Sequence, residues 1–143
     1  MVIEQVETPD AVADLYPLFK QLRPHLDFKE YMELVQAAKI RDQYQVIAAK
    51  EERELEAFGA MGMRVLYDLV HGKHLYIDDL VVHQSYRSQG IGAELLKYAE
   101  EKARELGCLT IRLSTGMENE LGKRFYQREG WDIRALTFKK KMQ

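Results

Sequence analysis

Cysteine, tryptophan and proline are scarce in this 143-residue sequence, which contains one, one and three of them. Because Cys108 has no second cysteine to pair with, an internal disulfide is excluded, and a reducing compartment is the natural setting. No apolar run approaches the roughly 18 residues needed to span a bilayer. The first residues, MVIEQVETPD, lack the basic and hydrophobic regions of a secretory signal. We therefore expect a soluble, cytoplasmic protein with no membrane partner.

The sequence also lacks a clear excess of basic over acidic side chains, or of acidic over basic ones. The formal net charge is -2, from 21 basic and 23 acidic side chains, whereas proteins that face nucleic-acid phosphates usually carry a clear excess of lysine and arginine. We therefore expect no nucleic-acid partner. What the sequence does have is a hydrophobic share of 46%. That share, at this length, is enough for a single domain over residues 1–143 with one core.

Helical and strand periodicities follow one another along the chain. Thr8 and Pro9 begin a helix that Pro17 should kink, and Asp27 with Glu30 resembles the capping box that begins a second helix. The other patterns predict helices at 90–107 and 120–129, a turn at 51–54, and strands at 2–7, 44–49, 55–66, 75–82, 108–115 and 131–140. The sequence contains no internal repeat and no interdomain linker.

The order of these elements predicts the fold class. A strand, a helix and a strand over residues 75–115 imply a parallel pair, because a right-handed crossover returns the chain to the same sheet. The strands at 44–49 and 55–66 are joined by a hairpin and should be antiparallel. We therefore predict an α+β (α/β) domain with a mixed sheet. Gly59 and Gly62 weaken their strand in isolation and mark a bulge or a close backbone approach.

A glycine-rich turn, YRSQGIGAELL, joins the strand at 75–82 to the next helix. Such a turn is an anion site, because unpaired backbone N–H groups and the helix dipole point at the ligand, and Arg87 adds charge. The phosphate loop of nucleotide hydrolases requires GK[ST] after its second glycine, but Gly92 is followed by Ala93 and Glu94. The dinucleotide fingerprint requires a third glycine where Leu95 stands. Both interpretations fail.

The remaining pattern is RxxGxG, formed by Arg87, Ser88, Gln89, Gly90, Ile91 and Gly92. It resembles the pyrophosphate-binding signature of the GCN5-related N-acetyltransferases, the GNAT family. The segment NELGKRFYQREGW resembles the second signature of that family, NxxAxxFYxxxGF, with matches at Asn119, Phe125, Tyr126 and Gly130. Gly122 replaces the usual alanine and Trp131 the usual phenylalanine. The order of elements also matches, so the resemblance covers essentially the whole chain.

The resemblance implies a fold and a co-substrate. The fold would be a mixed, mostly antiparallel sheet of six to seven strands flanked by about four helices, with one parallel strand pair splayed around the coenzyme. Acetyl-coenzyme A would be the acyl donor. Its binding residues would be Leu80, Val81, Val82, Arg87, Ser88, Gln89, Gly90, Ile91, Gly92 and Asn119. Asn119 could also cap the last helix. Val81 and Val82 break strict alternation, which indicates burial on both faces or a bulge.

The catalytic candidates are Tyr126, Asp78 and Asp79. Tyr126 matches the family tyrosine that protonates the departing thiolate, a role that suits a phenol because its pKa of about 10 exceeds the thiol value of about 8.5. Without the resemblance, a core tyrosine beside Phe125 is an equal alternative. The two aspartates interrupt an apolar strand, so at least one should face a polar cleft, where it binds the acceptor amine or relays its proton. Because successive strand side chains point to opposite faces, they should not act as a pair. A structural salt bridge is the alternative for either aspartate.

The remaining candidates concern the acceptor and metals. By the resemblance, the RPHL segment between the first two helices lines the acceptor pocket, which makes Arg23 and His25 substrate-binding candidates. His71 and His74 are three residues apart but lack clear third and fourth ligands, and His83 lies at a strand end. We therefore expect no metal site.

Together, these inferences predict an enzyme that moves an acetyl group from acetyl-coenzyme A to a primary amine by direct attack in a ternary complex. The acceptor would be a small-molecule or peptide amine, and its identity is left open. Cys108 is not expected to act as a nucleophile. The alternatives are a non-catalytic acyl-coenzyme A-binding regulatory module of the same fold and a nucleotide-binding domain. The resemblance implies that edge strands can pair into a homodimer, and it leaves the oligomeric state open.

Overall fold

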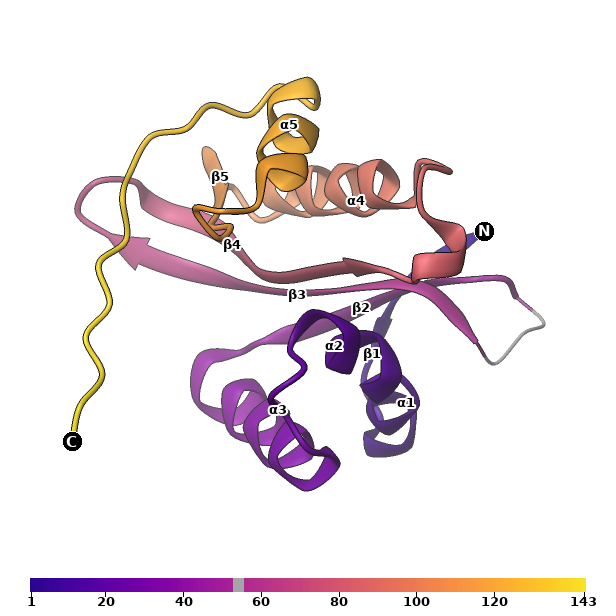
Figure 1. The fold of residues 1–143 in the computed structure, drawn as a ribbon. Helices are drawn as coiled ribbons and strands as arrows, with labels where there is room; N and C mark the ends of the chain where they lie inside the picture. The colour runs from indigo at the N-terminus through magenta and orange to yellow at the C-terminus, as the bar shows by residue number, and fades with distance from the viewer. Residues whose placement is uncertain (53–55) are drawn as a thin grey trace. The chain divides into compact units, whose positions relative to one another are not determined.

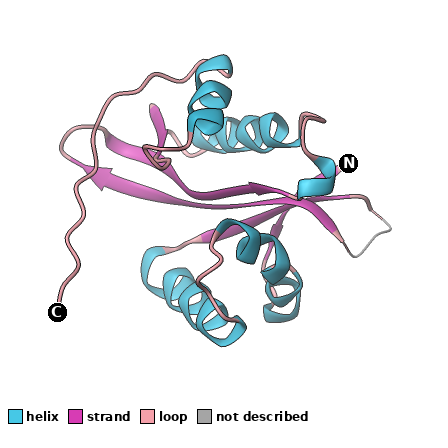
Figure 2. Cartoon of the chain, in the orientation of Figure 1, coloured by secondary structure: helices cyan, strands magenta, loops and turns pink. Residues whose placement is uncertain are grey.

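The computed structural model describes residues 1–52 and 56–143 of the chain. These residues divide into two compact units, Met1–Arg112 and Leu113–Gln143. The larger unit is a sheet with helices on both faces, as Figures 1 and 2 show. The predicted α+β class is therefore confirmed. The predicted turn at 51–54 lies partly outside the described residues.

The sheet has five strands in the order β1-β2-β3-β4-β5. They are β1 (Val2–Val6), β2 (Gln45–Lys50), β3 (Ala57–Asp68), β4 (Gly72–Val82) and β5 (Thr110–Leu113). Antiparallel pairing joins β1 to β2, β2 to β3 and β3 to β4. The prediction of a mostly antiparallel sheet is therefore confirmed. The chain passes from β4 to β5 through a helix, which is the crossover that the sequence predicts.

The helices of the first unit cover both faces of the sheet (Figure 1). One face carries α1 (Pro9–Asp14), α2 (Tyr16–Leu22) and α3 (Phe28–Asp42), and the other carries α4 (Ile91–Glu105). A short 3-10 turn, η1 (Gln84–Tyr86), precedes α4. No helix in the described residues combines the length and apolar character needed to cross a membrane.

The helix ends follow the predicted capping chemistry. The Thr8 hydroxyl accepts the Ala11 amide at 3.2 Å, and an Asp27 carboxylate oxygen accepts the Glu30 amide at 2.8 Å. Each such cap stabilises its helix by about 1 kcal/mol. The kink predicted at Pro17 is a complete break, because α1 ends at Asp14 and α2 begins at Tyr16.

The centre of the sheet is buried on both faces. Four consecutive residues of β2, from Val46 to Ala49, are buried, which requires covering layers on both sides. Gly59 of β3 lies directly beneath α4, where an added Cβ would stand 3.1 Å from Ile91 and 3.2 Å from Leu95. The close backbone approach predicted for this glycine is confirmed. The absence of a side chain lets α4 pack tightly on the sheet.

The second unit contains α5 (Glu120–Arg128). The prediction of a strand at 131–140 is wrong, because no strand forms among the described residues beyond α5. Apolar and polar residues do not alternate regularly in this segment. In an extended chain, Ile133 would lie on one face and Leu136 with Phe138 on the other. All three side chains are exposed. Among the described residues, the sheet therefore has five strands rather than the six to seven that the resemblance implied.

Candidate functional site

The glycine-rich loop connects β4 to α4. Gly90 is the residue that caps α4, and its backbone is left-handed with φ of 82°. Ser88 is also left-handed, with φ of 65°, a conformation that non-glycine residues adopt at a cost of about 1–2 kcal/mol. Strain of this kind persists where the surrounding structure enforces it, and it is common at ligand-binding loops.

The loop offers backbone donors that no described residue accepts from. Within the described part of the chain, the amide N–H groups from Arg87 to Gly92 have no protein acceptor. Helical hydrogen bonding begins at Glu94, which donates to the Gly90 carbonyl at 3.0 Å. Arg87 is exposed and makes no ion pair with any described residue. A free cation beside a positive helix terminus is favourable only when an anion joins them.

A β-bulge shapes the middle of β4. Gly62 pairs with Asp79 and Met63 pairs with Ile77, so Asp78 is an extra residue without a partner in β3. The extra residue breaks the alternation of side chains, and Asp78 and Asp79 both line one cavity. The prediction that these carboxylates point to opposite faces is therefore wrong. Val81 and Val82, for which the sequence indicated burial on both faces or a bulge, pair regularly with Ala60 and Gly59, so the bulge does not lie at these two residues.

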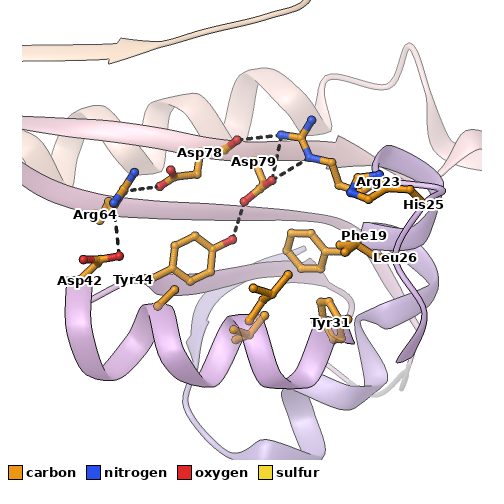
Figure 3. A pocket seen from close by; sticks show the side chains of 13 residues that line it. Phe19, Arg23, His25, Leu26, Tyr31, Asp42, Tyr44, Arg64, Asp78 and Asp79 are labelled. Carbon is orange, nitrogen blue, oxygen red and sulfur yellow. Dashed lines mark hydrogen bonds and ion pairs between the residues drawn. The ribbon is translucent and has the colours of Figure 1, made fainter. Parts of the chain in front are cut away.

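The cavity lies between the sheet and α2 and α3 (Figure 3). Its volume is about 490 Å³, which suits a small molecule. Its walls combine apolar and charged side chains from Phe19, Arg23, His25, Leu26, Tyr31, Leu34, Val35, Ala38, Asp42, Tyr44, Arg64, Asp78 and Asp79. Four residues proposed from the sequence for two different roles, Arg23, His25, Asp78 and Asp79, thus meet at one place.

Asp79 is held from two sides. The Tyr44 hydroxyl donates to one carboxylate oxygen at 2.6 Å, and Nε and Nη2 of Arg23 donate to the other at 3.2 and 3.0 Å. Both oxygens are therefore engaged, and the carboxylate is fixed in position (Figure 3). The salt bridge that was the alternative role for an aspartate is present here.

Asp78 has a different environment. Arg64 Nε donates to it at 3.0 Å, and Nη1 of the same guanidinium lies 3.6 Å from Asp42. Burial raises the pKa of the Asp78 carboxyl, and the charge and hydrogen bond of Arg64 oppose this only in part. A raised pKa makes a carboxylate a better proton acceptor near neutral pH. Of the two aspartates, Asp78 is therefore the better candidate base.

Sequence patterns missed Tyr44 and Arg64. Burial, and then the charge of Asp79, raise the pKa of Tyr44 well above its ordinary value, so the phenol keeps its proton and remains a donor. The available signal was Gly62, because a glycine inside an apolar strand marks a close approach. An added Cβ at Gly62 would overlap the Tyr44 hydroxyl. Arg64 is two residues from Gly62 along β3 and therefore falls on the same face.

Replacing Gly62 with alanine should destabilise the fold by about 1–3 kcal/mol, the usual cost of overpacking. The added methyl group would displace the Tyr44 ring and break its hydrogen bond to Asp79. Urea denaturation measures the loss. In the Tyr44→Leu background, where the phenol is absent, the same substitution should cost much less. Equal costs in the two backgrounds would contradict the proposed contact.

The second signature lies in the second unit. Asn119 caps α5 by accepting the Gly122 amide at 2.9 Å, and it donates to the Thr115 hydroxyl at 3.0 Å. A Cβ at Gly122 would overlap the Asn119 side chain in its present position, so an alanine there would require that side chain to shift. Burial raises the pKa of Tyr126, whose ring packs 5.1 Å from Phe125 between centroids. A phenol in this state is protonated at neutral pH.

The other coenzyme-binding candidates remain predictions. Val81 is buried, and the Val82 carbonyl accepts a hydrogen bond from the Gln21 side chain at 2.9 Å. His83 Nδ1 accepts the Ser85 amide at 3.1 Å, which stabilises the turn that leads into the loop.

Comparison with known proteins identifies a family and relatives that are named N-acetyltransferases. Residues 12–131 match the family described as the acetyltransferase (GNAT) family. The chain is 32% identical over 139 residues to the uncharacterized N-acetyltransferase YhdJ of Bacillus subtilis, and the match covers 96% of each protein. It is 36% identical to the aminoalkylphosphonate N-acetyltransferase of Salmonella typhimurium, over 62% of this chain and 58% of that protein.

Solved structures agree on the fold. A structure of the aminoglycoside N-acetyltransferase AAC(6')-Iy in complex with CoA superposes with a TM-score of 0.83 at 19% identity, covering 99% of this chain and 95% of that one.

Proposed function

Because the chain belongs to the acetyltransferase (GNAT) family, we propose that it transfers an acetyl group from acetyl-coenzyme A to a primary amine within a ternary complex. We also propose that residues 1–143 form a single N-acetyltransferase domain. The observation that carries the proposal is that, among the described residues, the amides from Arg87 to Gly92 have no protein acceptor and the Arg87 side chain has no ion-pair partner. The diphosphate of coenzyme A is an anion that these amides and the guanidinium can bind.

The proposed roles divide between the loop, the strand and the helices. The Arg87 side chain and the amides of Ser88, Gln89, Gly90, Ile91 and Gly92 bind the diphosphate. Backbone groups of Leu80, Val81 and Val82 contact the pantetheine arm, as an added strand would. Asn119 contributes a side-chain amide to the same arm.

The proposed reaction balances without a covalent enzyme intermediate. The neutral amine attacks the thioester carbonyl carbon, a C–N bond forms and the C–S bond breaks. Asp78 accepts the proton that the amine nitrogen loses, directly or through water, and Tyr126 gives its phenolic proton to the departing thiolate. The Asp78 pKa and the Tyr126 pKa are both raised, which suits a base and an acid at the same pH.

We propose the cavity at Asp78 and Asp79 as the acceptor site. Three carboxylates and two guanidinium groups line it, so its formal charge favours a cationic amine. The arginines can pair with an anionic group on the same acceptor, and His25 supplies a further polar contact. The Salmonella typhimurium relative is named for aminoalkylphosphonates and the solved neighbour for aminoglycosides, which supports a small primary amine as the acceptor.

A thiol-release assay with a panel of amines tests this function. The panel contains aminoalkylphosphonates, aminoglycosides, polyamines, amino acids and peptide N-termini, each with acetyl-coenzyme A. We expect thiol release that depends on both substrates and saturates with at least one small amine. Coenzyme A binding without turnover on any amine would instead favour a non-catalytic acyl-coenzyme A-binding module.

The Arg87→Ala variant should bind coenzyme A about tenfold more weakly, because a hydrogen-bonded charge pair contributes about 1.5–3 kcal/mol. Its affinity should also depend less on salt, since one ionic contact is gone. Calorimetry at two salt concentrations measures both effects. Arg104→Ala, which removes a cation from the other end of α4, is the matched control. Equal losses in the two variants would contradict a specific role for Arg87.

A further inference from the structure

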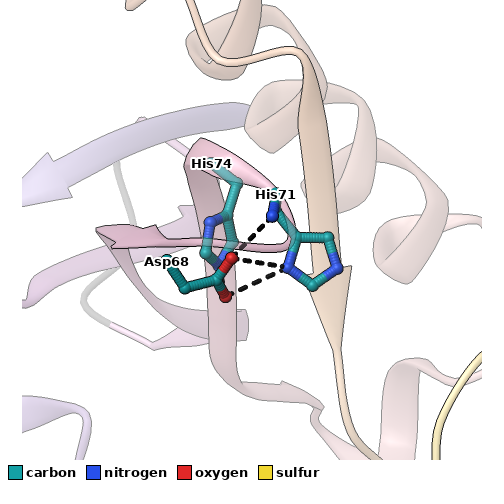
Figure 4. A group of neighbouring side chains, drawn as sticks. All are labelled: Asp68, His71 and His74. Atoms are coloured by element: carbon teal, nitrogen blue, oxygen red, sulfur yellow. Dashed lines mark hydrogen bonds and ion pairs between the residues drawn. The ribbon is translucent and has the colours of Figure 1, made fainter.

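A second cluster of titratable side chains lies at the turn between β3 and β4. Asp68, His71 and His74 each place one ligand atom within 4.8 Å of the others (Figure 4). His71 Nδ1 is 3.0 Å from both Asp68 oxygens, and His74 Nε2 is 3.8 Å from Oδ2. Asp68 thus supplies the third ligand that the sequence pattern lacked. Tetrahedral Zn²⁺ with bonds of about 2.0–2.2 Å holds its ligand atoms about 3.4 Å apart, and the two imidazole nitrogens lie 3.0 and 3.8 Å from Asp68 oxygens.

Hydrogen bonds fix the His74 ring and the Asp68 carboxylate in the way that metal ligands are usually fixed. His74 is fully buried, and its Nδ1 lies 3.0 Å from the Gly72 carbonyl oxygen. That carbonyl can only accept, so Nδ1 carries the proton and Nε2 presents its lone pair to the cluster. A histidine fixed through its other nitrogen by a backbone carbonyl is the usual arrangement behind a metal ligand. Asp68 is fixed as well, since its Oδ1 accepts the amides of Val70 and His71.

A cation already occupies the open side of the cluster. Arg112 Nε donates to His74 Nε2 at 2.9 Å, and its Nη2 lies 3.8 Å from Asp68 Oδ2. The guanidinium also lies over the Tyr76 ring, with Cζ 4.7 Å from the centroid. This ring can hold the guanidinium when it moves off the histidine. The ligand set therefore attracts positive charge, and Arg112 competes for it.

We propose that Asp68, His71 and His74 form a site for a borderline transition metal, represented by Zn²⁺, with Arg112 as the competing internal cation. Two imidazoles and one carboxylate suit Zn²⁺ and exclude Mg²⁺, which prefers oxygen ligands. Three protein ligands leave a fourth position for water. The three ligands lie at the turn between β3 and β4, and Arg112 lies on β5. None of these residues lines the cavity at Asp78 and Asp79.

Calorimetry of the metal-stripped full chain tests the site with Zn²⁺, and visible absorption of added Co²⁺ reports the coordination. We expect one ion per chain, a tetrahedral Co²⁺ spectrum and no response to Mg²⁺. His71→Ala, which changes a partly exposed turn residue, should weaken Zn²⁺ binding at least about tenfold. His83→Ala, outside the cluster, should not. Circular dichroism establishes that both variants are folded.

The Arg112→Leu variant should change Zn²⁺ affinity in the opposite direction. Removing the competing guanidinium should strengthen Zn²⁺ binding about tenfold, because His74 Nε2 and Asp68 lose a cationic partner. No Zn²⁺ binding at about 1 mM would overturn the site, and the cluster would then be a polar network that holds the turn. Binding that is equal in wild type and His71→Ala would overturn the ligand assignment. Unchanged affinity in Arg112→Leu would overturn the competition.

Discussion

The Tyr126→Phe variant should turn over about ten- to a thousandfold more slowly than the wild type, with coenzyme A affinity little changed. The phenol is proposed to protonate the thiolate as it leaves, and phenylalanine has no proton to give. Because burial raises the Tyr126 pKa, the wild-type donor is protonated across the neutral range. Phenylalanine keeps the ring contacts to Phe125 and Trp131, so the fold should be unaffected.

Turnover in the thiol-release assay and calorimetry with coenzyme A separate the two quantities. Tyr67→Phe, at an exposed position near the end of β3, controls for the loss of a phenol as such. The wild-type rate should also fall at high pH as the Tyr126 phenol ionises, and Tyr126→Phe should lack this fall. An unchanged turnover number in Tyr126→Phe would remove this residue from the chemistry.

The Asp78→Asn variant should have kcat/KM for the amine lowered about ten- to a hundredfold, while KM for acetyl-coenzyme A stays near the wild-type value. Asparagine keeps the shape of the side chain but accepts no proton from the attacking amine. The loss should be greatest above the raised pKa of Asp78, where the wild-type carboxylate is ionised and can accept a proton, and it should shrink as pH falls. Asp42→Asn, which removes the other carboxylate beside Arg64, should lower kcat/KM much less.

Stability provides a separate test of Asp78. Its folded-state pKa is raised, so the folded state holds this proton more tightly than the unfolded chain. Its contribution to stability is therefore most favourable below the unfolded pKa and declines as pH rises through the folded value. Asparagine removes that penalty at neutral pH but also weakens the Arg64 pair. We expect opposing effects and a melting temperature within about 5 °C of wild type. A much larger drop would mean that lost activity reflects unfolding.

Local signals in the sequence predicted much of the structure. The caps at Thr8 and Asp27, the helix after the glycine loop and the crossover to β5 all depend on residues close together in the chain. The RxxGxG pattern likewise identified a loop whose amides have no acceptor among the described residues. These features need little information from distant segments, which is why a single sequence contains them.

The acceptor cavity could not be predicted in the same way. Whether Asp78 and Asp79 share a face depends on one extra residue in β4 relative to β3, which a count of alternating residues cannot detect. Tyr44 reaches Asp79 because β2 and β3 pair in one register and Gly62 leaves space. The strand predicted at 131–140 failed because its apolar residues divide between two faces. Pairing between distant segments decides the first two features, whereas the third depends on the spacing of apolar residues within the segment itself.

Nuclear magnetic resonance of the ¹⁵N-labelled chain titrated with coenzyme A tests the central claim most directly, because each loop amide reports separately. We predict that the largest shift changes occur at Ser88, Gln89, Gly90, Ile91 and Gly92, and that NAD, which has a diphosphate but no pantetheine arm, binds more weakly. Unchanged loop amides at saturating coenzyme A, or tighter binding of NAD, would contradict the account.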